Sequence, residues 1–403
     1  MIYLTYGDDL MYRNTYVEIN IDNIIENVKN IIEKYNNYKY YIGVIKGHAY
    51  GHGEYIAKYI IENGINYLAV SSLDEAIETR KYIFKDFPIL CLEPIPLEYI
   101  PISIDNNVTL TISNIKYYDE LKKLKHKNIK FHLKLNTGMN RLGINNIKDV
   151  EKIYNETIDN DNLKMEGIYT HLSTNGVYDK LYKNQLDKFN YLTSSIDLNK
   201  IKIVHIGRST TLDFFPKIEF ANAVRIGIMM YGIKSTFPSD YGIRNKLRMR
   251  KYAKIREKYN LPIPYIENNI ELKQAFSLCS EVIDIQKVKR NEYVGYGSNN
   301  IILNDGYIAT IPIGYADGLS TNYKKIEVTI NKQKYKVIGT INMGMITVFV
   351  DDKVSLGDKV EVISMYDSYK EIAKNMNITP YVLMTSINNN VRRVYIKDNK
   401  IIS

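Results

Sequence analysis

The chain has 403 residues, 45% hydrophobic and 25% charged, which suits a globular protein with two separate cores. It has no apolar run long enough to span a bilayer, no signal-peptide pattern, and only two cysteines, so we expect a cytoplasmic protein without disulfides and without a membrane partner. The net charge of +9 accompanies abundant Lys, Ile, Asn and Tyr throughout the chain. We therefore interpret it as a matter of composition and not as evidence for a nucleic-acid partner.

Short β-rich segments recur eight times between residues 40 and 230. They are 41–46, 67–72, 88–92, 108–113, 131–136, 167–172, 202–207 and 224–229. Most are apolar throughout, as in strands buried on both faces of a parallel sheet, and helix-like segments such as EYIAKYIIENG separate them. This alternation predicts an α/β fold, a (β/α)₈ TIM barrel. A doubly wound open sheet is the alternative, but no G-x-G-x-x-G motif follows any of the strands.

The pattern changes after residue 270, where short strands alternate with Gly, Asn and Asp turns and predict an all-β domain. We place the barrel domain at 14–246 and the β-rich domain at 247–403, together with 1–13. Between the two patterns, residues 244–258 carry eight Lys or Arg against one Glu. A solvated helix or linker is the expected structure of this segment, and a charged arm toward a partner subunit is the alternative.

Polar residues gather on the predicted barrel strands, several of them near the strand ends. In strand order they are Lys46, Lys134, His171, His205 with Ser209 beyond it, and Arg225 near the start of the eighth strand. Barrel enzymes carry their chemistry at the carboxyl ends of the strands, and such side chains are costly inside a barrel unless they are paired. We therefore predict a polar site at the mouth of the barrel.

The segment VIKGHAYGHG (44–53) allows three interpretations. A metal site would need His48 and His52 on one face of a helix plus a third ligand, and the three glycines disfavour that helix, so we expect no metal. A phosphate loop would need G-x-x-x-x-G-K-[ST], which is absent. A lysine near other cations in a partly apolar mouth has a lowered pKa, as Schiff-base chemistry requires, although a lone lysine at a strand end can also simply reach out to solvent.

KGHAYGHG resembles the K-x-x-A-Y-G-H-G motif of the alanine racemase family, pyridoxal phosphate (PLP) enzymes that combine a barrel with a β-domain. Further segments match in family order, namely 72–76 (SLDEA), 133–144 (LKLNTGMNRLGI), 169–174 (YTHLST), 224–233 (VRIGIMMYGI) and 311–318 (IPIGYADG). The resemblance covers about residues 14–395. It implies a cytoplasmic homodimer with shared active sites that interconverts L- and D-alanine for peptidoglycan synthesis.

The resemblance also implies catalytic roles. Lys46 would hold PLP and act as acid and base on one face of the substrate, while Tyr315 of the other subunit would act on the opposite face. A racemase needs two such groups because one removes the α-proton and the other returns it from the opposite side. His171 would hydrogen-bond the tyrosine, Arg225 would face the PLP pyridine nitrogen, and His205 would support Arg225.

Binding roles follow from the same matches. The positions that match PLP phosphate ligands are Tyr50, Ser209, Gly227 and Ile228. Arg141 and the backbone of Met343 match the groups that bind the substrate carboxylate. Lys134 matches a lysine that is carbamylated in many members, which makes it an anion able to orient the arginine.

The chain departs from the family pattern at several positions. Asn389, in INNNVRR, stands where the family usually has a tyrosine near the substrate side chain, and a shorter residue leaves room for a hydroxymethyl group. The motif G-R-x-C-M-D reads GTINMG at 339–344, and Arg208 precedes the phosphate serine. A serine or broad-specificity racemase therefore remains the alternative to an alanine racemase. PLP carrier proteins lack the β-domain and the opposing tyrosine, and a PLP decarboxylase would need a cysteine motif that is absent here.

Overall fold

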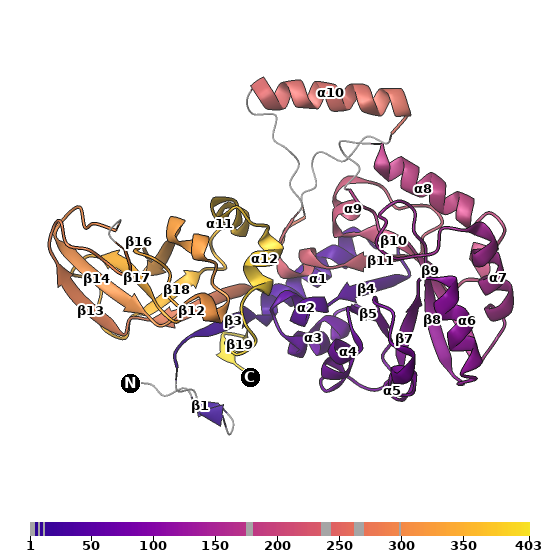
Figure 1. The fold of residues 1–403 in the computed structure, drawn as a ribbon, viewed down its shortest axis with the longest axis horizontal. Helices are drawn as coiled ribbons and strands as arrows, with labels where there is room; N and C mark the ends of the chain where they lie inside the picture. The colour runs from indigo at the N-terminus through magenta and orange to yellow at the C-terminus, as the bar shows by residue number, and fades with distance from the viewer. Residues whose placement is uncertain are drawn as a thin grey trace. The chain divides into compact units, whose positions relative to one another are not determined.

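The computed structural model describes residues 5–6, 9–10, 13–174, 180–234, 243–261, 270–297 and 300–403. The chain divides into two compact units (Figure 1). The barrel unit comprises Ile25–Gly47 and Glu54–Leu272, and the β unit comprises Met1–Ile24, His48–Gly53 and Lys273–Ser403. Among the described residues, no helix is long and apolar enough to cross a membrane.

The barrel unit is built on eight parallel strands that close in the order β10-β11-β4-β5-β6-β7-β8-β9. The strands are β4 (Tyr40–Val44), β5 (Tyr67–Val70), β6 (Ile89–Cys91), β7 (Val108–Ile112), β8 (Ile129–Lys134), β9 (Leu163–Tyr169), β10 (Ile203–Arg208) and β11 (Ala223–Ile226). Each overlaps one of the eight predicted segments, and most of their residues are buried. The predicted (β/α)₈ barrel is thus confirmed.

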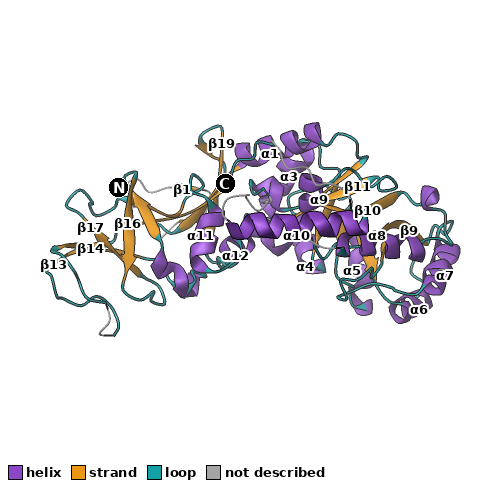
Figure 2. Cartoon of the chain, turned by 90° about the horizontal axis from the view of Figure 1, so that it is seen from above, coloured by secondary structure: helices purple, strands orange, loops and turns teal. Residues whose placement is uncertain are grey.

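Helices alternate with these strands (Figure 2). They are α1 (Ile21–Lys34), α3 (Ala57–Glu62), α4 (Leu73–Arg80), α5 (Ile100–Asp105), α6 (Ile115–Lys123), α7 (Ile147–Thr157), α8 (Leu181–Leu192) and α9 (Ser209–Phe214). Side-chain caps start three of them, because Ser72, Asn114 and Asn146 accept backbone N–H groups at the first turns of α4, α6 and α7. The helix α10 (Ile243–Tyr259) occupies the basic segment between the two predicted domains, as expected for a solvated helix.

The β unit contains a ten-stranded sheet in the order β13-β14-β17-β16-β15-β18-β12-β3-β19-β20. Its strands are β3 (Tyr16–Asn20), β12 (Phe276–Glu281), β13 (Asp284–Val288), β14 (Gly306–Ile311), β15 (Glu327–Ile330), β16 (Gln333–Ile338), β17 (Ile346–Val350), β18 (Lys359–Ile363), β19 (Arg392–Lys397) and β20 (Lys400–Ile401). A separate pair, β1 (Thr5–Tyr6) and β2 (Asp9–Leu10), precedes it. The predicted β-rich character is confirmed, and the unit also contains two short helices, α11 (Tyr369–Met376) and α12 (Pro380–Thr385).

The segment after β4 corrects one expectation. We predicted no helix in the glycine-rich stretch, yet Lys46–Tyr50 forms a single helical turn, α2. The turn has left-handed backbone angles, with φ of 63°, 50°, 51° and 56° at Gly47, His48, Ala49 and Tyr50. Non-glycine residues pay about 1–2 kcal/mol each for this conformation, so surrounding contacts must hold it. One such contact is the Arg393 Nε–H, which donates to Gly51 O at 3.1 Å within the β unit.

Candidate active site

Four of the predicted polar residues, and the predicted phosphate ligand Gly227, follow or end the barrel strands at their carboxyl ends. Lys46 lies two residues after β4, Lys134 ends β8, His171 lies two residues after β9, Ser209 follows β10, and Gly227 follows β11. In a closed parallel barrel all these strand ends lie at the same mouth. The strands thus bring the residues to one end of the barrel unit.

Arg225 occupies the centre of a buried hydrogen-bond network in the barrel unit. It is 4% exposed, and its two terminal nitrogens donate to the carbonyl oxygens of Thr170, His205 and Ile206 at 2.8–3.1 Å. No carboxylate among the described residues pairs with it. Burial lowers the pKa of Arg225 to about 10, which leaves it protonated at neutral pH.

Two histidines extend this network away from the mouth. Arg225 donates to His205 Nδ1 at 2.6 Å, and His205 Nε2 lies 2.8 Å from His132 Nδ1. An arginine can only donate, so His205 Nδ1 must accept and its Nε2 must carry the proton that is donated to His132. His132 Nε2 then carries its own proton and faces the Glu166 carboxylate at 3.7 Å. The donor and acceptor in the hydrogen bonds from Arg225 to His205 and from His205 to His132 therefore follow from the fact that Arg225 can only donate.

Glu166, a buried carboxylate, is the last member of this side-chain network. It accepts from Tyr67 Oη at 2.8 Å and from Lys202 Nζ at 2.7 Å. Burial alone would raise the pKa of Glu166, but the nearby His132 ring and the hydrogen bonds from Lys202 and Tyr67 outweigh this and hold that pKa well below its usual range. Burial lowers the pKa of both His132 and His205, so both rings are neutral. The carboxylate thus lies at the far end of a neutral relay from the arginine, a connection that no motif in the sequence indicated.

The two lysines of the mouth both have lowered pKa values. Lys134 is 7% exposed, and its ammonium nitrogen lies 4.3 Å from the centre of the Tyr169 ring. Burial, Arg225 and Arg141 lower the pKa of Lys134 far below its usual value. Burial and Arg141 also lower the pKa of Lys46, against opposing contributions from Glu75 and Glu93. A neutral amine is a nucleophile and a base, whereas an ammonium is neither.

His171 is also neutral. Burial and the charges of Arg225 and Lys134 hold its pKa far below the usual histidine value. Arg225 donates to His171 Nδ1 at 3.3 Å, so the ring proton lies on Nε2. His171 can therefore donate one hydrogen bond from Nε2 without carrying charge.

The predicted phosphate residues of the barrel unit form a compact group. Ser209 starts α9, and its Oγ accepts the Gly227 N–H at 3.0 Å. Ile228 follows in a buried 3₁₀ turn, Ile228–Tyr231. The hydroxyl of Thr210, beside Ser209, is buried without a hydrogen-bond partner among the described residues. An unpaired buried hydroxyl is costly, so it marks a place where a further acceptor fits.

Tyr315 lies in a tight loop of the β unit, in the 3₁₀ turn Tyr315–Asp317, and is 47% exposed. The backbone N–H groups of Tyr315 and Ala316 donate to Asn342 O and Met343 O at 3.0 and 2.9 Å. The Asp317 carboxylate accepts the Gly314 N–H at 2.9 Å and two hydrogen bonds from Arg13 at 2.7 and 2.8 Å. These bonds fix the loop while leaving the phenol open to solvent in this chain.

The left-handed turn holds two further predicted positions within the β unit. Asn389 Nδ2 donates to His48 Nε2 at 2.7 Å, and the Tyr50 ring packs 5.9 Å from that of Tyr381. The other histidine of the motif, His52, is buried with its ring 5.4 Å from that of Phe276. In the described part of the chain, no group of three or more His, Cys, Asp or Glu side chains is placed to hold a metal ion.

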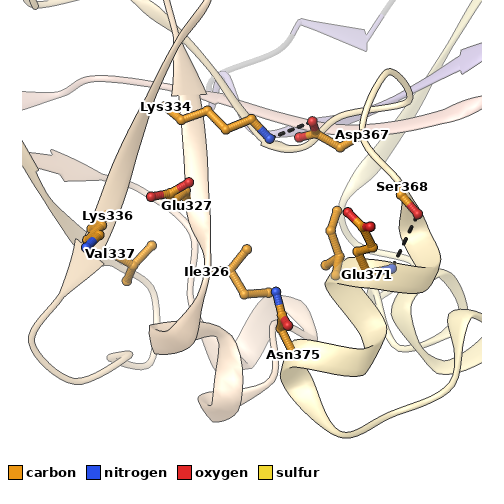
Figure 3. Close-up of a pocket in the computed structure, with 10 residues that line it drawn as sticks. Ile326, Glu327, Lys334, Lys336, Val337, Asp367, Ser368, Glu371 and Asn375 are labelled. Carbon is orange, nitrogen blue, oxygen red and sulfur yellow. Dashed lines mark hydrogen bonds and ion pairs between the residues drawn. The ribbon is translucent and has the colours of Figure 1, made fainter. Parts of the chain in front are cut away.

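A cavity of about 500 Å³ lies elsewhere in the β unit, between β15, β16 and α11 (Figure 3). Charged side chains line it, including the Lys334–Asp367 ion pair at 2.6 Å, Glu327 and Glu371. None of the predicted site residues borders this cavity. Its open, oppositely charged walls indicate solvated surface, and the buried polar network of the barrel unit is the stronger candidate for chemistry.

Comparison with known families decides the identity. The alanine racemase N-terminal domain matches residues 19–235, and the alanine racemase C-terminal domain matches residues 275–395. The chain belongs to the alanine racemase family. Alanine racemase 1 of Bacillus subtilis (strain 168) is 32% identical over 398 residues, which covers 97% of this chain and 95% of the relative.

Solved structures of this family resemble the racemase closely. The alanine racemase of Clostridium difficile 630 has a TM-score of 0.82 at 28% identity, with 98% of each chain covered. The alanine racemase of Bacillus anthracis with bound L-Ala-P has the same TM-score at 30% identity and the same coverage. Over its whole length, this chain is thus an amino-acid racemase by sequence and by fold.

The family depends on PLP, and the barrel unit of this racemase fits that cofactor. Arg225 is a buried cation and Lys134 is a buried amine, and neither has a carboxylate partner among the described residues, as expected where an anionic cofactor and an anionic substrate are to bind. Ser209 offers a hydroxyl beside the backbone of Gly227, and Thr210, the next residue in the chain, has a hydroxyl without a hydrogen-bond partner. Sequence reasoning missed His132, Glu166 and Thr210, because none of them lies in a recognisable motif.

Proposed function

We propose that this racemase interconverts L- and D-alanine with PLP by a two-base mechanism, with both active sites shared across a homodimer. Serine or a broader set of amino acids is the alternative substrate class. The observation that carries the proposal is Lys46, a partly buried amine with a lowered pKa at the mouth of a barrel, where Arg141 and Arg225 act on it as cations. When bound, PLP supplies an electron sink for the negative charge that forms on the substrate α-carbon.

Lys46 would hold the cofactor and move a proton on one face of the substrate. Its lowered pKa makes the amine a better proton acceptor at neutral pH than an exposed lysine. Ser209, Gly227, Ile228 and Tyr50 would bind the cofactor phosphate, and Thr210 would join them with its unpaired hydroxyl.

Tyr315 of the partner subunit would move the proton on the opposite face. A phenol needs a lowered pKa to act as a base, and a hydrogen bond donated to its oxygen has that effect. His171 Nε2–H is such a donor, because Nδ1 is occupied by Arg225. The exposed phenol within one chain supports a role in the site of a second chain.

Arg225 would face the pyridine nitrogen of the cofactor and donate a hydrogen bond to it. Because an arginine does not give up its proton, Arg225 would leave the pyridine nitrogen unprotonated and would weaken the electron sink that the cofactor supplies. His205 and His132 hold the arginine in place for this role.

Arg141 and the Met343 backbone would bind the substrate carboxylate. Lys134 is a buried amine with a strongly lowered pKa, which favours its neutral form. The neutral amine is the form that reacts with carbon dioxide to give a carbamate and a released proton. The carbamate would place a negative charge between the two arginines that now lower its pKa, and so would orient Arg141.

One contact favours the serine alternative. Asn389 donates from Nδ2 to His48, which leaves its Oδ1 to accept a hydrogen bond from a substrate hydroxyl. Alanine offers no such donor. Supply of a D-amino acid for peptidoglycan by a cytoplasmic enzyme remains the physiological role we propose.

Two variants test the proposal. The wild type with added PLP should be yellow and should exchange the α-proton of alanine for deuterium, and Lys46→Ala should lose both properties. Tyr315→Phe should stay yellow while losing proton exchange in one stereochemical direction far more than in the other. A colourless active wild type contradicts the PLP assignment, and an equal loss in both directions with loss of colour contradicts the role of Tyr315.

A further inference from the structure

Most of the net charge of the protein lies in one helix. The helix α10 contains eight Lys or Arg and one Glu, a net charge of +7 out of +9 for the chain, so the other 386 residues together carry +2. The helix lies between the two family matches, which end at residue 235 and resume at residue 275. The charge is therefore an addition to the racemase framework and is not spread over it.

The two faces of α10 differ. Met249, Tyr252, Ile255 and Tyr259 are partly buried, and the Lys180 ammonium before α8 lies 5.1 Å from the centre of the Tyr259 ring. The partial burial of this face and the contact between Lys180 and Tyr259 indicate that it packs against the rest of the barrel unit.

The opposite face is exposed and basic. Lys246, Arg250, Lys254 and Lys258 recur every four residues and so line one side of the helix, with Lys251 beside them. Leu247 lies among these cations and is 59% exposed. We call these six residues the basic face.

Nothing in the described residues neutralises the basic face. Lys246, Arg250, Lys251 and Lys254 have no carboxylate partner there, whereas lysines elsewhere on the surface, such as Lys122 and Lys152, form ion pairs at 2.7 Å. Cations four residues apart on a helix repel one another, so the arrangement opposes the stability of α10. An anionic partner would remove that cost.

We propose that the basic face binds the surface of a phospholipid bilayer that contains anionic lipids. Lysine-rich helix faces are attracted to anionic headgroups, and an exposed leucine among them can enter the boundary between headgroups and acyl chains. The contact is peripheral, so it requires no apolar span, and the absence of such a span led sequence reasoning to expect no membrane partner.

The same observations disfavour nucleic acid as the partner. A helix that enters a major groove is contacted on several sides, but one side of α10 is partly buried. Proteins that bind single strands stack bases on exposed aromatic rings, and the tyrosines of α10, Tyr252 and Tyr259, lie on the partly buried side. An exposed leucine such as Leu247 would bury no apolar surface against the phosphates of a nucleic acid.

Co-sedimentation of the full-length, PLP-loaded racemase with vesicles tests the proposal. We expect binding to vesicles of equal parts phosphatidylglycerol and phosphatidylcholine, weakening with added salt, and none to phosphatidylcholine alone. The variant Lys246→Gln/Arg250→Gln/Lys251→Gln/Lys254→Gln should lose a few hundredfold in partitioning, because each cation near an anionic surface contributes about fivefold. Leu247→Gln should lose a smaller factor that added salt does not change.

The matched control removes the same charge elsewhere. Lys85→Gln/Lys127→Gln/Lys289→Gln/Lys332→Gln changes four exposed lysines of other segments and should bind vesicles like the wild type. Racemase activity should be unchanged in both quadruple variants, which separates this proposal from the catalytic one and shows that the variants fold. Equal loss in both quadruple variants, or wild-type vesicle binding by the α10 variant, overturns the proposal. So does tighter binding to duplex DNA or to poly(U) than to vesicles at equal phosphate concentration.

Discussion

The loop that carries Tyr315 allows a prediction that separates its position from the rest of the site. Gly314 lies against the neighbouring loop so closely that an added Cβ would come within 2.5 Å of the Met343 carbonyl carbon, and closer still to Asn342 O and Met343 O. All three are backbone atoms and cannot turn aside. In Gly314→Ala the two loops must therefore separate by about 1 Å to restore ordinary contact.

The size of the effect follows from what that separation breaks. The hydrogen bonds from Tyr315 N–H to Asn342 O and from Ala316 N–H to Met343 O join the same two loops, and each is worth about 0.5–1.5 kcal/mol. We expect Gly314→Ala to destabilise the β unit by about 1–3 kcal/mol. A shift of about 1 Å in a reacting group can cost on the order of a hundredfold in rate. The kcat for racemisation should therefore fall about a hundredfold, while the colour of bound PLP, which depends on Lys46, stays.

Gly344→Ala is the matched control. It changes the same residue type in the facing loop, but an added Cβ there meets nothing within 4 Å. We expect wild-type kcat and stability from it. The assay is racemisation followed in both directions, together with the absorbance of bound PLP and urea unfolding. Wild-type kcat in Gly314→Ala would refute the argument that the loop contact positions Tyr315, and so would an equal loss in both glycine variants.

Three further predictions concern the barrel network and the substrate. Glu166→Gln should lower the stability of the barrel unit by about 1–3 kcal/mol at neutral pH, because its charge-assisted bonds become neutral ones. Folding lowers the pKa of Glu166, so the difference in unfolding free energy between wild type and variant is complete above the unfolded pKa of about 4.3 and shrinks as the pH falls below it. A difference in urea unfolding that stays constant from pH 7 to pH 3 contradicts the assignment. Lys134→Gln should raise the KM for alanine and should remove any dependence of the rate on added bicarbonate, whereas a bicarbonate effect that persists in the variant rules out the carbamate. Asn389→Tyr should shift the ratio of kcat/KM values toward alanine over serine, and an unchanged ratio rejects its role in substrate choice.

The barrel could be predicted from the sequence because most of its strands are apolar and regularly spaced. In a closed parallel barrel the carboxyl ends of all strands lie at the same mouth, so the place of the polar residues there followed from the fold. The relay from Arg225 through His132 to Glu166 could not be predicted in this way. His132 and Glu166 lie in ordinary strand sequences, and only the register of β8 against β9 brings them together. Gly167, whose added Cβ would lie 2.8 Å from the His132 ring, makes the room for that ring.

Two local structures also escaped prediction. The glycines of KGHAYGHG argue correctly against a right-handed helix, but propensities for ordinary helices say nothing about a left-handed turn that includes His48, Ala49 and Tyr50. The helix α12 has only six residues, too few for a periodic pattern. In each case the surrounding fold determines the local conformation.

The ion pair between Arg13 and Asp317 joins residues 304 positions apart in the chain. The carboxylate it engages also holds the turn that presents Tyr315. A protease that cuts between Arg13 and Tyr16 would therefore release Arg13 from its ion pair with Asp317, while removing no residue of the proposed active site. Preparations cleaved in that short stretch would lose 13 to 15 residues of this sequence and would keep the colour of bound PLP, yet lose turnover. The integrity of the amino-terminal segment is thus a quality criterion for any assay of this enzyme.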